Sequence, residues 1–137
     1  MPKFDYAPAP ESRSVVSLKE SYGLFIDGKF TDTTDGRTFK TISPATEEVL
    51  AEVTEAGPAD VDRAVDAARK AYEQTWSGMP GKDRSKYLFR IARLIQERSR
   101  ELAVLESLDN GKPIRESRDV DIPLVAAHFF YHAGWAD

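Results

Sequence analysis

The sequence predicts an α+β chain in which two short β-hairpins precede three main α-helices. Asp27-Gly28 lies between two short apolar runs, and apolar and polar residues alternate over 38–42 and 49–54; both patterns are typical of paired strands. Apolar residues then recur every three or four positions over 59–72 and 83–108, which is the spacing of one face of an α-helix.

Residues 1–21 carry three prolines and little periodicity, so they are expected to form an extended N-terminal arm. The first hairpin should cover 24–30, with Asp27 and Gly28 at positive φ in a two-residue turn. The alternating runs 38–42 and 49–54 should pair as the second hairpin. An isolated two-stranded hairpin is marginal in water, so each hairpin needs a surface to pack on.

Gly57-Pro58 should open the first main helix, because proline suits the first helical position. Its apolar stripe is expected to be buried: Val61, Ala64, Val65, Ala68, Ala71 and Tyr72. The long segment 83–113 should bend or break near Arg98, where 96–101 has no apolar residue. It should stop at Asn110-Gly111, which favour the left-handed conformation past a helix end.

The last predicted helix follows Asp121, interpreted as its N-cap, and is apolar in nearly every direction. A helix that is apolar all round must be covered all round. We therefore expect the chain to be an incomplete piece of a larger protein or one half of an interface. The residues on which this expectation rests include Leu124, Val125, Phe129, Phe130, Tyr131 and Trp135.

Composition excludes several classes of function. The formal net charge of −4 argues against nucleic acid as the main partner. The absence of cysteine excludes disulfides, thiolate metal sites and a cysteine nucleophile within these residues. Neither a signal peptide nor a membrane span is expected, because no apolar run is long enough, and a cytoplasmic location is predicted.

Two side-chain patterns resemble catalytic or metal sites. His128 and His132 have the spacing with which two imidazoles on one helix face bind zinc, but Phe129 stands where a metalloprotease helix has glutamate. Polar positions on a largely buried helix are the favoured interpretation. The acidic pairs Asp119/Asp121 and Glu101/Glu106 are better explained by capping and solvated faces. No catalytic residue is therefore assigned.

Five segments, in order, resemble the NAD(P)-dependent aldehyde dehydrogenase superfamily. L-F-I-D-G-K-F at 24–30 is similar to its opening hairpin, and I-S-P-A-T-E-E-V-L-A-E-V at 42–53 is similar to N-P-A-T-G-E-V-I-A-x-V. The helix at 59–72 also fits, and E-S-L-D-N-G-K-P at 106–113 resembles E-T-L-D-N-G-K-P. Finally, F-F-Y-H-A-G-W-A-D at 129–137 resembles F-R-Y-Y-A-G-W-A-D.

The resemblance implies an α/β family and places 22–137 in the N-terminal part of its cofactor-binding domain. It implies that the full-length family member oxidises an aldehyde to a carboxylic acid with NAD or NADP, using a cysteine thiolate downstream of this match. This chain alone is expected to be inactive and to bind no cofactor. Its expected partners are the remainder of the enzyme or a second copy, and an aldehyde.

The resemblance also implies two sets of site residues. Many members bind a structural K⁺ or Na⁺ through main-chain oxygens, at positions matching Thr41, Ile42 and Asp109, and the family's remaining ligand lies beyond the matched residues; oxygen ligands suit hard cations. The final helix borders the aldehyde entrance tunnel in the family, and Val120 and Leu124 match tunnel-facing positions. Two alternatives remain open: a non-catalytic interaction module, and one half of a split enzyme that docks through the apolar last helix.

Overall fold

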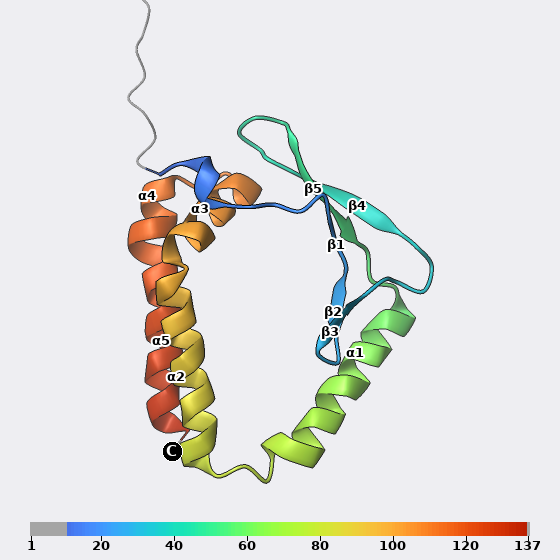
Figure 1. The fold of residues 1–137 in the computed structure, drawn as a ribbon, viewed down its shortest axis with the longest axis vertical. Helices are drawn as coiled ribbons and strands as arrows, with labels where there is room; N and C mark the ends of the chain where they lie inside the picture. The colour runs from blue at the N-terminus through green and yellow to red at the C-terminus, as the bar shows by residue number, and fades with distance from the viewer. Residues whose placement is uncertain (1–10, 137) are drawn as a thin grey trace, which may run out of the picture.

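The computed structural model describes residues 11–136, so 1–10 of the predicted arm and Asp137 lie outside the described residues. The elements follow a ring: the strands and α1 (Pro58–Ala71) form one side, and α2 (Gly81–Glu97) with α5 (Ile122–Trp135) form the other (Figure 1). The predicted α+β organisation, with hairpins first and helices after them, is confirmed.

The first hairpin forms as predicted. Strands β2 (Leu24–Ile26) and β3 (Lys29–Thr31) pair antiparallel. Asp27 and Gly28 connect them with φ values of 53° and 77°, as a two-residue turn with left-handed residues requires. The rings of Phe25 and Phe30 meet edge to face across the pair, with centroids 5.2 Å apart.

The second sheet contains one more strand than predicted. β4 (Thr38–Ile42) and β5 (Val49–Thr54) pair antiparallel with the predicted bounds, and β1 (Ser21–Tyr22) adds to β5 in parallel. β1 begins at Ser21, the last residue of the segment interpreted as an extended arm, and two residues are too few to give an alternating pattern. Within the same segment, the short 3₁₀ turn η1 (Arg13–Val15) packs on α3 (Ser99–Asn110).

The first main helix begins with Pro58, as predicted, and continues past α1 into the π-helical turn η2 (Tyr72–Trp76). Residues 77–80 then connect it to α2. The long segment breaks at Arg98 (φ −102°, ψ 17°), the position at which its apolar periodicity is interrupted. α3 ends at Asn110, and Gly111 follows in the left-handed conformation (φ 77°), also as predicted.

The last helix differs from prediction at its start. α4 (Ile114–Glu116), the π-helical turn η3 (Ser117–Asp121) and α5 form one uninterrupted helical run. Asp121 has helical dihedrals (φ −68°, ψ −54°) and makes no capping hydrogen bond, so its interpretation as an N-cap is wrong. Its carboxylate instead pairs with the Lys112 ammonium, an ion pair that joins η3 to the segment after α3.

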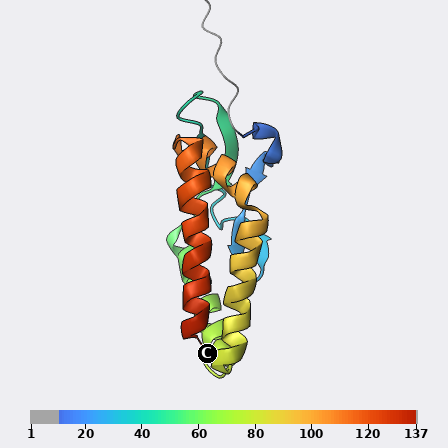
Figure 2. The same ribbon diagram turned by 90° about the vertical axis from the view of Figure 1, so that its left-hand side faces the viewer.

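α2 and α5 run antiparallel and side by side (Figures 1 and 2). The buried residues of both helices are small and seven positions apart: Ser85 and Ala92 on α2, Ala126 and Ala133 on α5. Midway between them, the rings of Phe89 and Phe130 meet with centroids 6.0 Å apart. Small side chains on facing stripes let two helices approach closely, and this contact carries much of the apolar packing of the chain.

One predicted burial pattern is wrong for the described residues. The stripe on α1 was expected inside, but Val61 and Val65 are half exposed and Tyr72 is 58% exposed. The apolar surface of α5 was expected to exceed what these residues can cover, and Trp135 is indeed 74% exposed. Within 11–136, α1 touches only β2 and η2 closely, so most of its apolar face meets no other element. No helix in that range is both long and apolar enough to cross a membrane.

Candidate functional site

Two of the predicted cation ligands are brought together across the ring. The Thr41 hydroxyl, near the end of β4, donates a hydrogen bond of 2.5 Å to Oδ1 of Asp109, in the last turn of α3. A Cβ on Gly111 would lie 2.8 Å from Cγ of Pro44, so the helix end and the strand end are in direct contact. This contact places the Asp109 carboxylate at the end of β4.

The third predicted ligand, Ile42, directly follows Thr41 at an irregularity in the sheet. The register of β4 with β5 shifts between these two residues, and a bulge of this kind bends the strand and interrupts its hydrogen-bond ladder. A carboxylate beside a strand end offers oxygen ligands, which suit hard cations such as K⁺ or Na⁺. Within 11–136, no three His, Cys, Asp or Glu side chains cluster in a way that would hold a metal ion.

The predicted tunnel residues do not line the groove that contains Asp109. Val120, in η3, is 55% exposed, and Leu124, in α5, is 51% exposed. The groove, about 390 Å³ in volume, is instead lined on α5 by Ile122 and Val125.

Lys112 fixes the start of the last helical run. Its ammonium pairs with the Asp121 carboxylate and lies 3.8 Å from Oε1 of Glu106. The hydrogen bond to Asp121 raises the pKa of Lys112 above its usual value. The Lys112 carbonyl accepts a 2.7 Å hydrogen bond from the Ser107 hydroxyl. These contacts hold η3, and with it Val120, against the end of α3.

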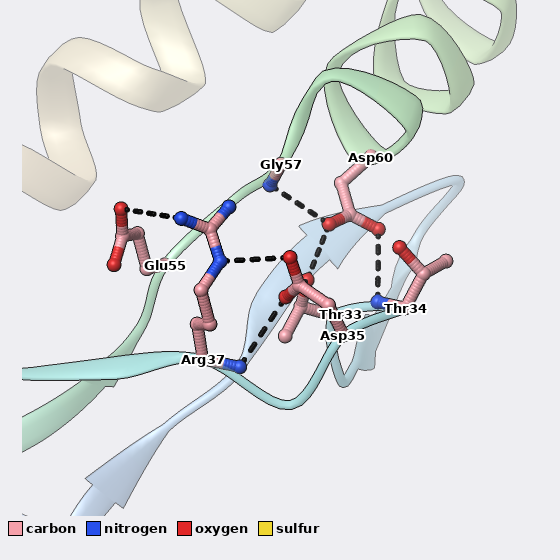
Figure 3. Close-up of polar contacts among 7 residues, drawn as sticks. All are labelled: Thr33, Thr34, Asp35, Arg37, Glu55, Gly57 and Asp60. Atoms are coloured by element: carbon pink, nitrogen blue, oxygen red, sulfur yellow. Dashed lines mark hydrogen bonds and ion pairs between the residues drawn. The ribbon is translucent and has the colours of Figure 1, made fainter.

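Sequence reasoning missed a polar network around Asp60, the third residue of α1 (Figure 3). The carboxylate is 1% exposed and accepts hydrogen bonds from the Thr33 hydroxyl, Gly57 N–H (3.0 Å) and Thr34 N–H (3.3 Å). Nη2 of Arg63, one turn later, lies 2.6 Å from Oδ1. Asp60 therefore joins the start of α1 to the loop between β3 and β4.

The electrostatics of Asp60 follow from these donors. The Thr33 hydroxyl first, then the Gly57 N–H and the Arg63 guanidinium, hold its pKa well below the usual range, and together they outweigh burial, which raises it. The sequence signal was Asp60 at a helix start, where a carboxylate also gains from the helix dipole. Its partners Thr33 and Thr34 are 27 and 26 positions away, so local pattern does not reveal them.

Arg37 makes two further ion pairs at the same loop (Figure 3). Nε of Arg37 donates to Asp35 at 2.7 Å, and Nη1 donates to Glu55 at 3.2 Å. Oδ1 of Asp35 lies 3.1 Å from the Thr33 hydroxyl, which shares its one hydrogen between this carboxylate and the nearer Asp60. The hydrogen bond with Arg37 lowers the pKa of Asp35 and raises that of Arg37. Arg37 therefore links this loop to Glu55, the residue that follows β5.

Comparison with known proteins gives one consistent family. The sequence model of the Aldehyde dehydrogenase family matches residues 30–137. Aldehyde dehydrogenase family 2 member B4, mitochondrial, from Arabidopsis thaliana is 47% identical over 83% of this chain and 21% of its own length. Benzaldehyde dehydrogenase, mitochondrial, from Antirrhinum majus is 44% identical over 83% of this chain and 22% of its own length.

Solved structures agree with the sequence relatives. The NAD⁺ complex of an aldehyde dehydrogenase from Bacillus cereus superposes with a TM-score of 0.82 at 43% identity, covering 88% of this chain and 26% of that one. The chain thus spans about a quarter of the length of the proteins it matches.

Proposed function

Because this chain belongs to the aldehyde dehydrogenase family, we propose that it forms part of an enzyme that oxidises an aldehyde to a carboxylic acid with NAD(P)⁺. The observation that carries this proposal is the family match over 30–137, at 43–47% identity to the relatives described above. Because the chain spans about a quarter of their length, the proposed activity requires residues of the kind found in the remaining three quarters.

Within that enzyme, the role of these residues is structural and positional. The family chemistry begins with a cysteine thiolate, and the 137 residues contain no cysteine. When bound, the nicotinamide cofactor supplies the hydride acceptor. NAD is favoured over NADP by the Bacillus cereus complex and by a second relative named as an NAD complex. No residue of this chain is assigned to the cofactor.

We propose further that Thr41, Ile42 and Asp109 bind a structural K⁺ or Na⁺. The Thr41–Asp109 hydrogen bond and the strand irregularity at Ile42 support this, since oxygen atoms are the ligands that hard cations prefer. The stability of the chain should then rise when KCl or NaCl replaces tetramethylammonium chloride at equal ionic strength. Asp109→Ala should abolish the difference, whereas a salt response unchanged in that variant would contradict the site.

Val120 and Leu124 are proposed to border the aldehyde entrance. Both are apolar and half exposed, and the Lys112–Asp121 pair fixes the turn that carries Val120. An apolar border favours apolar or aromatic aldehydes, and one relative is named a benzaldehyde dehydrogenase. In an active enzyme containing this segment, Leu124→Asp should raise KM for benzaldehyde more than KM for acetaldehyde.

A chimera tests the proposed function directly. This chain would replace the matching quarter of the Bacillus cereus enzyme, and NADH formation from propanal or benzaldehyde would be followed at 340 nm. The chimera should be active, whereas the 137-residue chain alone and a chimera lacking the segment should not. A correctly folded, tetramer- or dimer-sized chimera without turnover would overturn the proposal, as would turnover by the purified chain alone.

One observation favours a second candidate, an interaction module or half of a split enzyme. Tyr131 and Trp135 are largely exposed on α5, with ring centroids 6.0 Å apart, and form an apolar surface suited to a partner protein or a second copy. Co-expression of the chain with the remainder of the Bacillus cereus enzyme separates the candidates. Activity restored by two separate chains supports the split enzyme, and a stable inactive complex supports the module.

The proposed compartment is the cytoplasm, which a fluorescent fusion of the whole gene product tests.

A further inference from the structure

Two histidines lie one turn apart on the exposed side of α5. His128 and His132 have parallel rings, with an interplanar angle of 17° and centroids 6.5 Å apart. Both side chains are exposed, in contrast to the largely buried helix expected from the sequence. They are the only histidines in the chain, which also contains no cysteine. Every imidazole of the molecule is therefore in this pair.

The helix supplies the spacing that a shared metal ion requires. Positions i and i+4 lie on one face with Cβ atoms about 5–6 Å apart. Transition metals bind imidazole nitrogens at about 2.0–2.1 Å, so two such rings meet at one ion after small side-chain rotations. Tyr131 touches His132 edge to face at 5.2 Å and limits its movement to one side. On the side toward His128, the two imidazole rings face each other.

We propose that His128 and His132 together bind one divalent transition-metal ion, of the class that includes Ni²⁺, Cu²⁺ and Zn²⁺. Imidazole suits these ions and disfavours Mg²⁺ and Ca²⁺. No third His, Cys, Asp or Glu side chain joins the pair within 11–136, so water completes the coordination and the ion exchanges with solvent. The site differs from a zinc-protease centre, because Phe129 occupies the position of the catalytic glutamate.

The pair is a feature of this chain and does not belong to the family motif. His132 stands where F-R-Y-Y-A-G-W-A-D has its second tyrosine, so one of the two ligands is absent from that pattern. The site is also distinct from the proposed K⁺ or Na⁺ site, which uses oxygen atoms at the end of β4. The two proposals therefore involve different residues and different classes of ion.

The experiment titrates NiCl₂ into the tag-free 137-residue chain by isothermal calorimetry. One Ni²⁺ should bind per chain, and His128→Gln or His132→Gln should each weaken binding at least about tenfold, because the second imidazole acts at high effective concentration. The matched control, Ala127→His combined with His128→Gln, keeps two histidines but turns one of them about 100° around the helix. It should bind as weakly as the single variants, with far-UV circular dichroism unchanged.

A second measurement reports on both rings directly. The chain has two imidazoles, so its NMR spectrum contains only two sets of imidazole signals. Paramagnetic Ni²⁺ should broaden both sets at the same concentration. Equal affinity in the control with the moved histidine would overturn the proposal, as would retained binding in the double variant His128→Gln/His132→Gln. One ion per two chains, or broadening of only one ring, would also contradict a site within a single α5.

Discussion

The two sides of the ring are held together by different forces. On the side of the strands and α1, the largest fully buried side chain is the Asp60 carboxylate, and the apolar face of α1 is open. On the side of α2 and α5, the buried residues are small: Ala92, Ala126 and Ala133, with Ser85 beside them. Directional hydrogen bonds fix the first side, whereas close contact between helix backbones fixes the second.

This difference shows how a chain with little buried apolar surface keeps a defined shape. The buried apolar residues among 11–136 are five alanines and one valine: Ala51, Ala92, Ala103, Val104, Ala126 and Ala133. Apolar burial of about 25 cal/mol per Å² gives little from such side chains. Hydrogen-bond geometry and helix spacing therefore have to specify the arrangement, and substitutions at these positions should have larger effects than substitutions at the exposed aromatics.

The largest effect is expected at Asp60. Asp60→Ala removes the acceptor that the Gly57 and Thr34 N–H groups share with the Thr33 hydroxyl, and the buried Gly57 N–H left without a partner is costly. The variant should lower the thermal midpoint more than any other substitution proposed below. Circular dichroism at 222 nm measures the midpoint, and Asp66→Ala, an exposed carboxylate on the same helix, is the matched control.

The same carboxylate predicts how stability depends on pH. The pKa of Asp60 is lower in the folded chain than in the unfolded chain, so the unfolded state binds the proton more readily. The stabilisation is therefore fully present above the ordinary Asp pKa of about 3.9 and is lost as pH falls from there toward the folded pKa. Asp60→Asn should flatten the loss of stability between about pH 5 and pH 2, and an unchanged acid transition would contradict it.

A smaller effect is expected on the side of α2 and α5, where a substitution destabilises the fold by overpacking and not by loss of hydrogen bonds. Ala126→Leu adds three side-chain heavy atoms at a 2% exposed position in the contact between α2 and α5. Overpacking of this kind costs about 1–3 kcal/mol. Urea unfolding followed by tryptophan fluorescence measures it, and Ala127→Leu, at the exposed neighbouring position, is the control that should cost less than half as much.

Sequence patterns predicted the fold where the signal was local. The turn at Asp27-Gly28 and the left-handed Gly111 depend on the conformational preferences of the residues themselves, and the helix break at Arg98 follows the interruption of the apolar pattern over 96–101. β1 and the helical dihedrals of Asp121 were missed because they depend on partners elsewhere in the chain, β5 and Lys112. Burial of the α1 stripe was wrong because periodicity shows which face is apolar, but does not show what covers it.

The candidate sites divide in the same way. The approach of Thr41 to Asp109 was implied by resemblance, since no local pattern relates residues 68 positions apart. The Asp60 network also joins residues far apart in the sequence, and no sequence motif marks it, so only the structure reveals it. The histidine spacing was visible in the sequence, but the exposure of both rings was not. Spacing therefore identifies candidates, and three-dimensional placement decides between their interpretations.

Thr41→Val tests the contact that joins the two sides of the ring. The substitution keeps the β-branched shape and removes the hydroxyl that donates to Asp109. A hydrogen bond of this kind contributes about 1 kcal/mol, so the unfolding free energy should fall by that amount without loss of either sheet or helix signal. Thr54→Val, in the neighbouring strand β5, is the control, and equal losses in both variants would argue against a specific contact.

The smallest effect is expected at Glu55, and it decides whether the Asp60 network acts as one unit. Glu55 accepts from Arg37 at 3.2 Å, but both side chains are about half exposed, and exposed ion pairs contribute about 0–1 kcal/mol. Arg37 keeps its shorter bond to Asp35 in Glu55→Gln, so the thermal midpoint should change little and should become less dependent on salt. If Glu55→Gln instead lowered the midpoint as much as Asp60→Asn, the exposed pairs and the buried carboxylate would be strongly coupled. The stability of the strand side of the ring would then depend on its exposed ion pairs as well as on the buried Asp60. The helical side, by contrast, would still depend on the packing of buried alanines.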